Sequence, residues 1–266
     1  MTSWRVARAS LGLGVRMVLA YRLEVAVQIA SAALVTVLNW SLWTAILEGR
    51  DAVAGRSGPE MTTYVVVAWI LTTFYGTRVD QLIAHRVRTG EIAAELLRPW
   101  SLHAHLYLRD LGRAGASLLF STLPLAVLAV VALPLRLPER PLTWLLLIPA
   151  LWLAHALSFG LAWLVGMAAF RLRSATGLAH LKAATLALLS GALVPLDIYP
   201  EPLRSIALWL PFQGLSHFPA DLFVERLALG ELWRPFALQV GWVVALWLLG
   251  RAAWRGGTRA IVIQGG

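Results

Sequence analysis

Long stretches without charged residues constrain this chain more than any other feature of its sequence. A membrane core about 30 Å thick is crossed by about 20 mostly apolar residues in a helix. Six stretches meet or approach this requirement: residues 25–47, 61–77, 114–135, 141–170, 174–196 and 235–250. Because 59% of the 266 residues are hydrophobic and only 14% are charged, a soluble domain could not bury this much apolar surface. We expect an all-α membrane protein with six transmembrane helices, forming one domain over residues 1–266 with the six-span bundle at 24–254.

Basic residues are distributed unevenly between the connections of the six expected spans. Sixteen of the 23 Lys and Arg residues lie in the N-terminal segment, the second and fourth connections and the C-terminal tail, and seven lie in the other connections. Since positive side chains near span ends stay on the cytoplasmic side, we expect both termini, including the tail at 255–266, in the cytoplasm. The net charge of +9 then reflects membrane orientation and anionic lipid, and no nucleic-acid partner is expected.

The first 23 residues have the pattern of a helix that lies on the membrane surface. At about 100° per residue, Arg5, Arg8, Gly12 and Arg16 fall on one face, and apolar side chains cover the opposite face. Such an interfacial helix places its apolar face in the lipid and its arginines near the headgroups. The alternative is that these arginines only set the topology.

The segment between the last two expected spans, 197–234, has an irregular apolar pattern. Its charge-free run at 205–220 is broken by Pro211 and Pro219. This run is too short and too kinked for an independent span. We expect a re-entrant or interfacial hairpin on the outer side of the membrane, and an ordinary outer loop with amphipathic pieces is the alternative.

Motifs for nucleotide, metal or thiol chemistry are missing from the chain. A phosphate-binding loop has the pattern G-x-x-x-x-G-K-[ST], but Lys182, the only lysine, lacks the preceding glycine and is followed by alanine. Zero cysteines exclude disulfides, thiolate metal ligands and cysteine nucleophiles. We therefore expect no ATPase activity, bound cofactor or metal in this chain. The role of Lys182 stays open between snorkelling to the membrane surface and contact with a substrate or another helix.

Two alternative functions come from other protein classes. An intramembrane serine hydrolase or protease could use Ser158 or Ser190 with His155 as the base, although such residues in apolar helices more often form hydrogen bonds between helices. A transporter that works without an ATPase is the second alternative. The scarcity of ionisable residues within the expected spans argues against it, because ion-coupled transporters usually need buried acids.

A short cytoplasmic segment at 88–99 carries the most informative local pattern. It predicts a helix of about two turns in which Ile92 and Leu96 share one face and Glu91 and Glu95 share another. So short a helix is not stable alone in water. We expect it to dock on a cytoplasmic partner; packing against the membrane surface or the chain's own helix ends is the alternative.

Two sequence patterns then indicate a family. The pattern R-x-G-x-I-x-x-x-L-L-R-P begins at Arg88. A second pattern, S-G-A-L-V-P-L-D-I-Y-P, begins at Ser190 and is followed by L-P-F at Leu210 and F-P at Phe218. In these patterns, their order, the arginine-rich leading helix and the six-span plan, the chain resembles ABC-2-type transporter permeases, in particular small six-span subunits with a separately encoded ATPase.

This resemblance implies the membrane subunit of an ATP-driven exporter in the bacterial cytoplasmic membrane. Two such subunits, the same chain or a related one, would form the translocation path, and separate ATPase subunits would bind ATP and Mg. The leading helix would also touch the ATPase. Substrate residues do not carry over, so the cargo is unknown. The resemblance assigns ATPase coupling to Gly90, Glu91, Ile92, Glu95, Leu96, Leu97, Arg98 and Pro99. It assigns an outer gate to Gly191, Pro195, Pro200, Pro211, Phe212 and Pro219.

Overall fold

The computed structural model describes residues 4–98, 101–172 and 176–259, and the regular secondary structure in this part is helical apart from one short β-hairpin. Four continuous helical stretches in it are long and apolar enough to cross a membrane. They are Leu23–Leu47 within α2 (Arg22–Leu47); Leu102–Ala132, formed by α6 (Leu102–Ser117), a π-helical turn (Leu118–Thr122) and α7 (Leu123–Ala132); Pro141–Ala168, which is α8; and Leu229–Thr258, which includes α12 (Trp233–Arg259). They confirm the first, third, fourth and sixth predicted spans.

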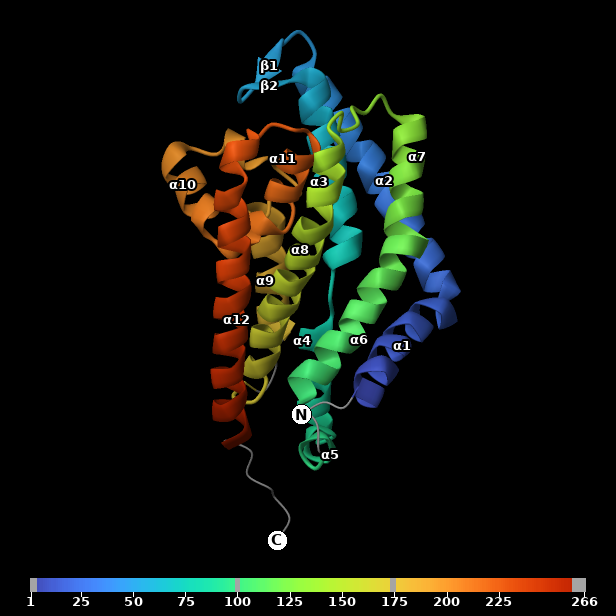
Figure 1. The fold of residues 1–266 in the computed structure, drawn as a ribbon, viewed down its shortest axis with the longest axis vertical. Helices are drawn as coiled ribbons and strands as arrows, with labels where there is room; N and C mark the ends of the chain where they lie inside the picture. Colours follow the sequence, from blue (N-terminus) through green and yellow to red (C-terminus); the bar gives the residue numbers. More distant parts are fainter. Residues whose placement is uncertain (1–3, 99–100, 173–175, 260–266) are drawn as a thin grey trace.

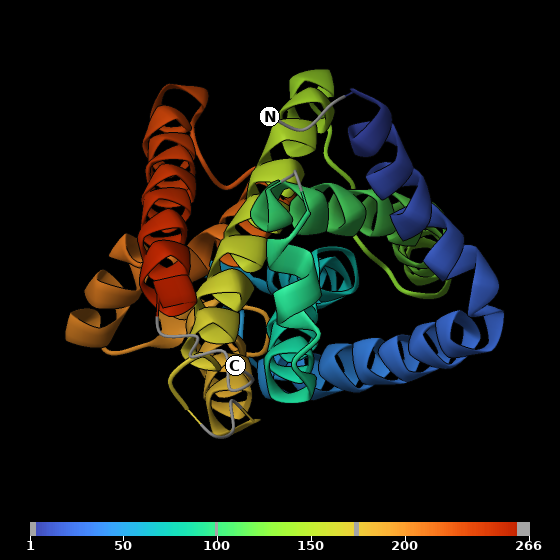
Figure 2. The same ribbon diagram turned by 90° about the horizontal axis from the view of Figure 1, so that it is seen from below.

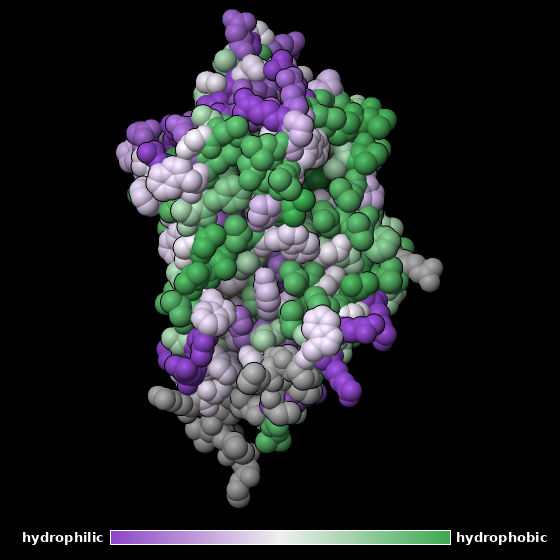
Figure 3. All heavy atoms as spheres, in the orientation of Figure 1, coloured by the Kyte–Doolittle hydropathy of each residue, from purple (hydrophilic) through white to green (hydrophobic). Residues whose placement is uncertain are grey.

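These helices turn apolar side chains outward rather than into a core. In the first and last of the four, only 17% of the most apolar window is buried. Leu34 and Leu38 of α2 and Val244 and Leu248 of α12 are among the exposed side chains. Figure 3 shows a broad hydrophobic band between two polar ends. Because such a surface is stable only against lipid or another apolar surface, the chain is a multi-pass membrane protein.

The two remaining predicted spans fold as shorter or less apolar helices. α3 (Gly58–Tyr75) covers most of 61–77 and lies inside the bundle, where most of its side chains are buried (Figures 1 and 2). The described part of α9 (Thr176–Leu189) has 14 residues, and the helix ends just before Gly191, which adopts φ 79° where the chain turns. Residues 174–175 of the fifth predicted span lie outside the described part. Six spans therefore stay a prediction.

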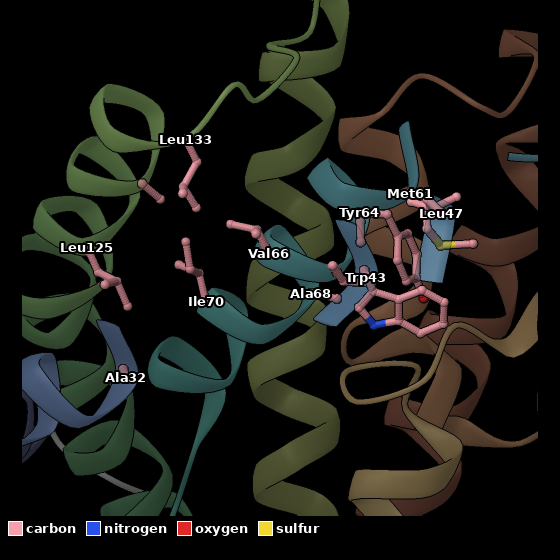
Figure 4. Close-up of a cluster of buried hydrophobic side chains, with 13 residues drawn as sticks. Ala32, Trp43, Leu47, Met61, Tyr64, Val66, Ala68, Ile70, Leu125 and Leu133 are labelled. Carbon is pink, nitrogen blue, oxygen red and sulfur yellow. The ribbon is translucent and has the colours of Figure 1, made fainter. Parts of the chain in front are cut away.

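Packing around α3 explains its position inside the bundle. Val66 and Ile70 point toward Leu125 of the α6–α7 span, and Tyr64 lies on the side of Trp43 from α2 (Figure 4). All five side chains are buried. α3 is not among the four stretches that are apolar enough to cross a membrane. This is compatible with its position, since its neighbours are protein side chains rather than lipid.

α1 (Trp4–Ala20) is the helix predicted at the N-terminus, and it packs directly on α6. A Cβ atom on Gly14 would lie 1.9 Å from the Arg109 carbonyl oxygen, and one on Gly112 would lie 2.1 Å from the Leu11 carbonyl oxygen. The two backbones therefore meet through these glycines. The chain bends at Tyr21 into α2 (Figure 2). The arginines predicted to face the membrane surface are exposed: Arg5, Arg8 and Arg16.

The bundle has two distinct ends (Figure 1). The hairpin end carries β1 (Ala52–Val53), β2 (Arg56–Ser57), α10 (Glu201–Trp209) and α11 (His217–Phe223). The arm end carries α5 (Ile92–Leu96), the lower part of α4 (Val79–Thr89), the start of α1 and the end of α12. The described residues among those predicted for coupling, and the residues predicted for the gate, thus lie at opposite ends.

Candidate functional site

α4 and α5 form a helical arm at the arm end. α4 begins after three non-helical residues, 76–78, and ends where Gly90 adopts φ 78°, a left-handed conformation that favours glycine. The chain then reverses, with the Ala93 N–H donating to the Gly90 carbonyl oxygen at 3.1 Å. α5 has only five residues. It is shorter than the predicted two turns, because Gly90 ends the preceding helix so close to it.

Glu95 fixes α5 to α4. Its carboxylate oxygen lies 3.1 Å from Arg86 Nη1 and 3.2 Å from Arg98 Nη1, and its side chain is only 7% exposed. Ile92 is also buried, whereas Glu91 is exposed. The acidic face expected from Glu91 and Glu95 is therefore wrong, because Glu95 turns inward to the two arginines.

The outward side of α5 is apolar. Leu97 is 88% exposed, and Ala93 and Ala94 beside it are exposed as well. Of the other residues predicted for coupling, Pro99 and the side chain of Leu96 lie outside what the structure describes. The arm thus presents a leucine at its tip, directly after α5, while Glu95 is held inward by two arginines.

At the hairpin end, one fully buried arginine joins three parts of the chain. A two-residue turn with positive φ at both positions connects β1 to β2 and places Arg56 inside the protein. Arg56 donates from Nε to Asp197 Oδ2 at 2.8 Å and from Nη2 to Asp221 Oδ1 at 2.5 Å. Its guanidinium carbon lies 4.3 Å from the centre of the Tyr64 ring. Arg56 therefore ties the loop after the first span to α3, to the 3₁₀ turn Leu196–Ile198 and to α11.

Opposite charges outweigh burial in this network. Burial alone would lower the pKa of Arg56, but Asp221 and Asp197 raise it above its ordinary value. Burial would likewise raise the pKa of Asp197, but Arg56 lowers it. Ligand atoms of Asp197, His217 and Asp221 lie within 4.8 Å of one another, a spacing that a metal could use. The guanidinium already pairs with both carboxylates, so it occupies the electrostatic role that a metal would have there.

Gly191 packs closely against this network. Its carbonyl oxygen accepts a hydrogen bond from the Tyr64 hydroxyl at 3.2 Å, and a Cβ at Gly191 would lie 2.6 Å from that hydroxyl oxygen and 2.9 Å from His217 Cβ. The Tyr64 hydroxyl also lies 2.8 Å from His217 Nδ1. The structure thus brings Gly191 against α11, which contains Pro219. Among the residues predicted for the gate, Pro200 is exposed, Phe212 is half-buried, and the others are buried: Gly191, Pro195, Pro211 and Pro219.

The sequence predicted no site for the charged members of this network. Arg56 counted only toward the topology, and no role was predicted for Asp197 or Asp221. One signal was available, because Asp197 follows the apolar stretch 174–196 and Asp221 follows the charge-free run 205–220. A lone acid at such a position is costly unless a cation pairs with it.

Comparison with known families decides the class of this protein. Residues 33–265 match the family model of ABC-2 family transporter proteins, which is most of the chain. The chain belongs to the ABC-2 transporter family. No match to a curated protein was found. The family match confirms the resemblance seen in the sequence and identifies a membrane component of a class that is typically a non-catalytic permease.

This ABC-2 transporter protein buries more acidic groups than its sequence suggested. Asp80 of α4 lies 2.7 Å from Lys182 Nζ of α9. Asp110 of α6 lies 2.8 Å from Arg113 Nε and 3.0 Å from His155 Nε2 of α8. Both acids come from segments next to the expected spans, and folding carries them inside. Membership of the ABC-2 family, and not a lack of buried acids, therefore argues against a transporter without an ATPase.

Neither serine considered for a hydrolase, Ser158 or Ser190, forms a hydrogen bond with His155 in the part of the chain that the structure describes. His155 pairs with Asp110, and no hydrogen bond there joins its ring to Ser158. Ser190 instead accepts a hydrogen bond from the Ala192 N–H at 3.3 Å. A nucleophilic serine needs a base within hydrogen-bond reach, and these contacts have the character of links between helices and turns.

Proposed function

We propose that the chain is the permease subunit of an ATP-driven ABC exporter. It docks a separate ATPase, which binds ATP and Mg, through α5, and it forms the translocation path with a second copy or a related permease. The observation that carries this proposal is the tip of the arm. There, Leu97 is exposed while Glu95 is held inward by two arginines. Burial of this leucine by a partner would stabilise both the side chain and the short helix that it follows.

In this arrangement α3 and α9 complete six spans, and the arm end lies in the cytoplasm of a bacterium. Two observations support this topology. The start of α1, the end of α12 and α5 lie at one end of the bundle (Figure 1), and basic residues are concentrated in the connections assigned to that side. The exposed arginines of α1 would then face lipid headgroups at the inner surface.

The outer gate is formed by residues 191–219 at the opposite end. Its support is the network around Arg56, which holds Asp197 and Asp221 against the first outer loop. Separating these charges without new partners is costly in a low-dielectric interior. The gate is therefore closed at rest, and opening requires work from elsewhere in the assembly.

The test replaces Leu97 by aspartate and compares it with Leu137→Asp, the same change at an exposed position of the hairpin end. Burying a leucine contributes about 1.5–3 kcal/mol, so losing it should weaken ATPase binding by about tenfold to a hundredfold. We expect Leu97→Asp to reach normal membrane levels and to lose co-purifying ATPase, and Leu137→Asp to retain it. Equal retention of the ATPase by both variants would show that the arm is not the docking element.

A further inference from the structure

An ion pair between α4 and α9 is used by neither the arm tip nor the gate. Lys182 Nζ lies 2.7 Å from Asp80 Oδ2, and the two side chains are 14% and 2% exposed. Lys182 is the only lysine of the chain, and Asp80 stands in the first turn of α4. A carboxylate buried this deeply is strongly destabilising without a cation. The pair therefore holds α9 to α4.

α4 and α5 are joined so that they move together. Glu95 of α5 pairs with Arg86 of α4, and Ile83 and Ile92 belong to one buried apolar cluster. α4 crosses α8 closely at Gly166, where a Cβ would lie 2.9 Å from Ile83 Cδ1 and 3.3 Å from the Asp80 Cα. A displacement of α5 is thus passed along α4 to the turn that contains Asp80.

α9 connects this ion pair to the network at the hairpin end. Just beyond its last turn, the Ser190 carbonyl oxygen accepts a hydrogen bond from the His217 N–H at 2.8 Å. The next carbonyl, that of Gly191, accepts one from the Tyr64 hydroxyl. Within the described part of the chain, Lys182–Asp80 is the one ion pair made by α9, and most of its remaining side chains are exposed or half-buried. The helix is therefore held firmly at these two places.

We propose that Asp80 and Lys182 are positioning residues that transmit movement of the α4–α5 arm through α9 to the outer gate. The inference rests on the proposed function, because it takes the arm as the ATPase contact. The pair fixes α9 to the moving arm at one end, and backbone hydrogen bonds fix it to the gate at the other. A lysine that only snorkelled would extend toward water, whereas Lys182 reaches a carboxylate that is almost fully buried.

The absence of cysteine from the chain permits a clean test with one introduced thiol. Ala192→Cys places it at a buried position next to Gly191. The labelling rate with a membrane-impermeant maleimide is measured in the ATPase complex, without nucleotide and after trapping with ADP and vanadate. In the parent, which carries Ala192→Cys and no further substitution, we expect trapping to change the labelling rate by at least about threefold. The ratio of the labelling rates with and without trapped nucleotide should fall to about one in Asp80→Asn, in Lys182→Gln and in the doubly neutral variant Asp80→Asn/Lys182→Gln. The ATPase should stay bound in all three.

Matched variants separate signalling from folding. The doubly neutral variant leaves no unpaired buried charge, Lys182→Arg keeps the pair, and the exchange Asp80→Lys/Lys182→Asp keeps it with reversed polarity. The last two should restore the response, and His180→Gln, at an exposed position of α9, should not change it. Thermal unfolding confirms that each compared variant is folded.

Each outcome decides between the two proposals. A full response in the doubly neutral variant would overturn the inference, and so would loss of response in a folded Lys182→Arg variant. Both results concern the ion pair alone, provided that the parent responds. A parent that binds no ATPase, or that shows no response to trapped nucleotide, would instead refute the proposed function.

Discussion

Arg56 illustrates how one side chain can join distant parts of this protein. The two carboxylates that accept its hydrogen bonds, Asp197 and Asp221, lie 141 and 165 positions away in the sequence, and all three side chains are nearly or fully buried. A buried charge of this kind stabilises only as a member of its pair, since removing one partner leaves the other without compensation. The change in the free energy of unfolding caused by a substitution at Arg56 therefore depends on the carboxylates that would remain without their cation.

We expect Arg56→Gln to lower the free energy of unfolding by about 3–5 kcal/mol, because Asp197 and Asp221 lose their shared cation. Denaturation of the detergent-solubilised protein measures this loss. Arg50→Gln provides the control, since Arg50 is exposed in the same loop and surface changes usually stay within about 0.5 kcal/mol. A similar small effect for both variants would contradict the role given to Arg56.

The same network predicts sensitivity to acid. Arg56 lowers the pKa of Asp197 in the folded protein, so the unfolded chain binds this proton more readily. The stabilisation is complete above the unfolded pKa near 4 and is lost as the pH falls through the lower folded pKa. We expect the thermal midpoint of the wild type to fall between pH 5 and pH 3, and the fall to be smaller for Asp197→Asn. Identical pH profiles would exclude Asp197 as the source.

At the scale of single residues, the family resemblance named two glycines, one for coupling and one for the gate, without predicting their backbone conformation. Gly90 and Gly191 were singled out, and both adopt the positive φ that favours glycine. The partners of Arg56 could not be predicted, because pairing between loops so far apart depends on how the helices pack. Glu95 shows the same limit, since its inward direction is set by Arg86 on the preceding helix.

Among the helices, those facing lipid were predicted best. Long charge-free stretches suffice to define α2, α8 and α12, because lipid imposes the apolar length directly. α3 and α9 depend on the protein around them. α3 is surrounded by protein side chains, and α9 ends at a turn that Tyr64 and His217 complete. Their role as spans is therefore not decided by composition.

The contact between α1 and α6 predicts that Gly→Ala substitutions at two nearby glycines change the stability of the protein in opposite directions. Gly to Ala within a helix normally stabilises it by about 0.5–1 kcal/mol. We expect this gain for Gly12→Ala, since no atom lies within 4 Å of its added Cβ. Gly14→Ala should instead destabilise the protein, because its Cβ would overlap the Arg109 carbonyl oxygen. Thermal unfolding of the two variants tests this difference, and a gain in both would mean that the helices do not meet at Gly14.

For the whole molecule, the important relation is between the two ends of the bundle. The arm end presents an apolar tip, and the hairpin end holds buried ion pairs, with α9 reaching from the Asp80 contact to the Gly191 turn. A permease driven by an ATPase needs a mechanical link of this kind, since ATP is bound on one side of the membrane and the exit lies on the other. The orientation of the ends is therefore the property on which the proposed function depends most.

Reporter fusions at Gly55, Gly90 and Gly266 test this orientation. Gly55 lies in the hairpin turn and Gly90 lies in the arm. The first and third fusions should report opposite sides, with Gly55 outside and Gly266 in the cytoplasm. Gly90 should report the same side as Gly266, which requires that α3 with α4 crosses the membrane. If Gly90 is cytoplasmic, a cytoplasmic Gly266 in turn requires that α9 crosses, because α6–α7, α8 and α12 alone would place it outside. Activity of an outside reporter at Gly90 would exclude α3 as a span and would remove the arm from the ATPase side; with a cytoplasmic Gly266 it would leave four spans. An outside signal only at Gly266 would exclude α9 as a span.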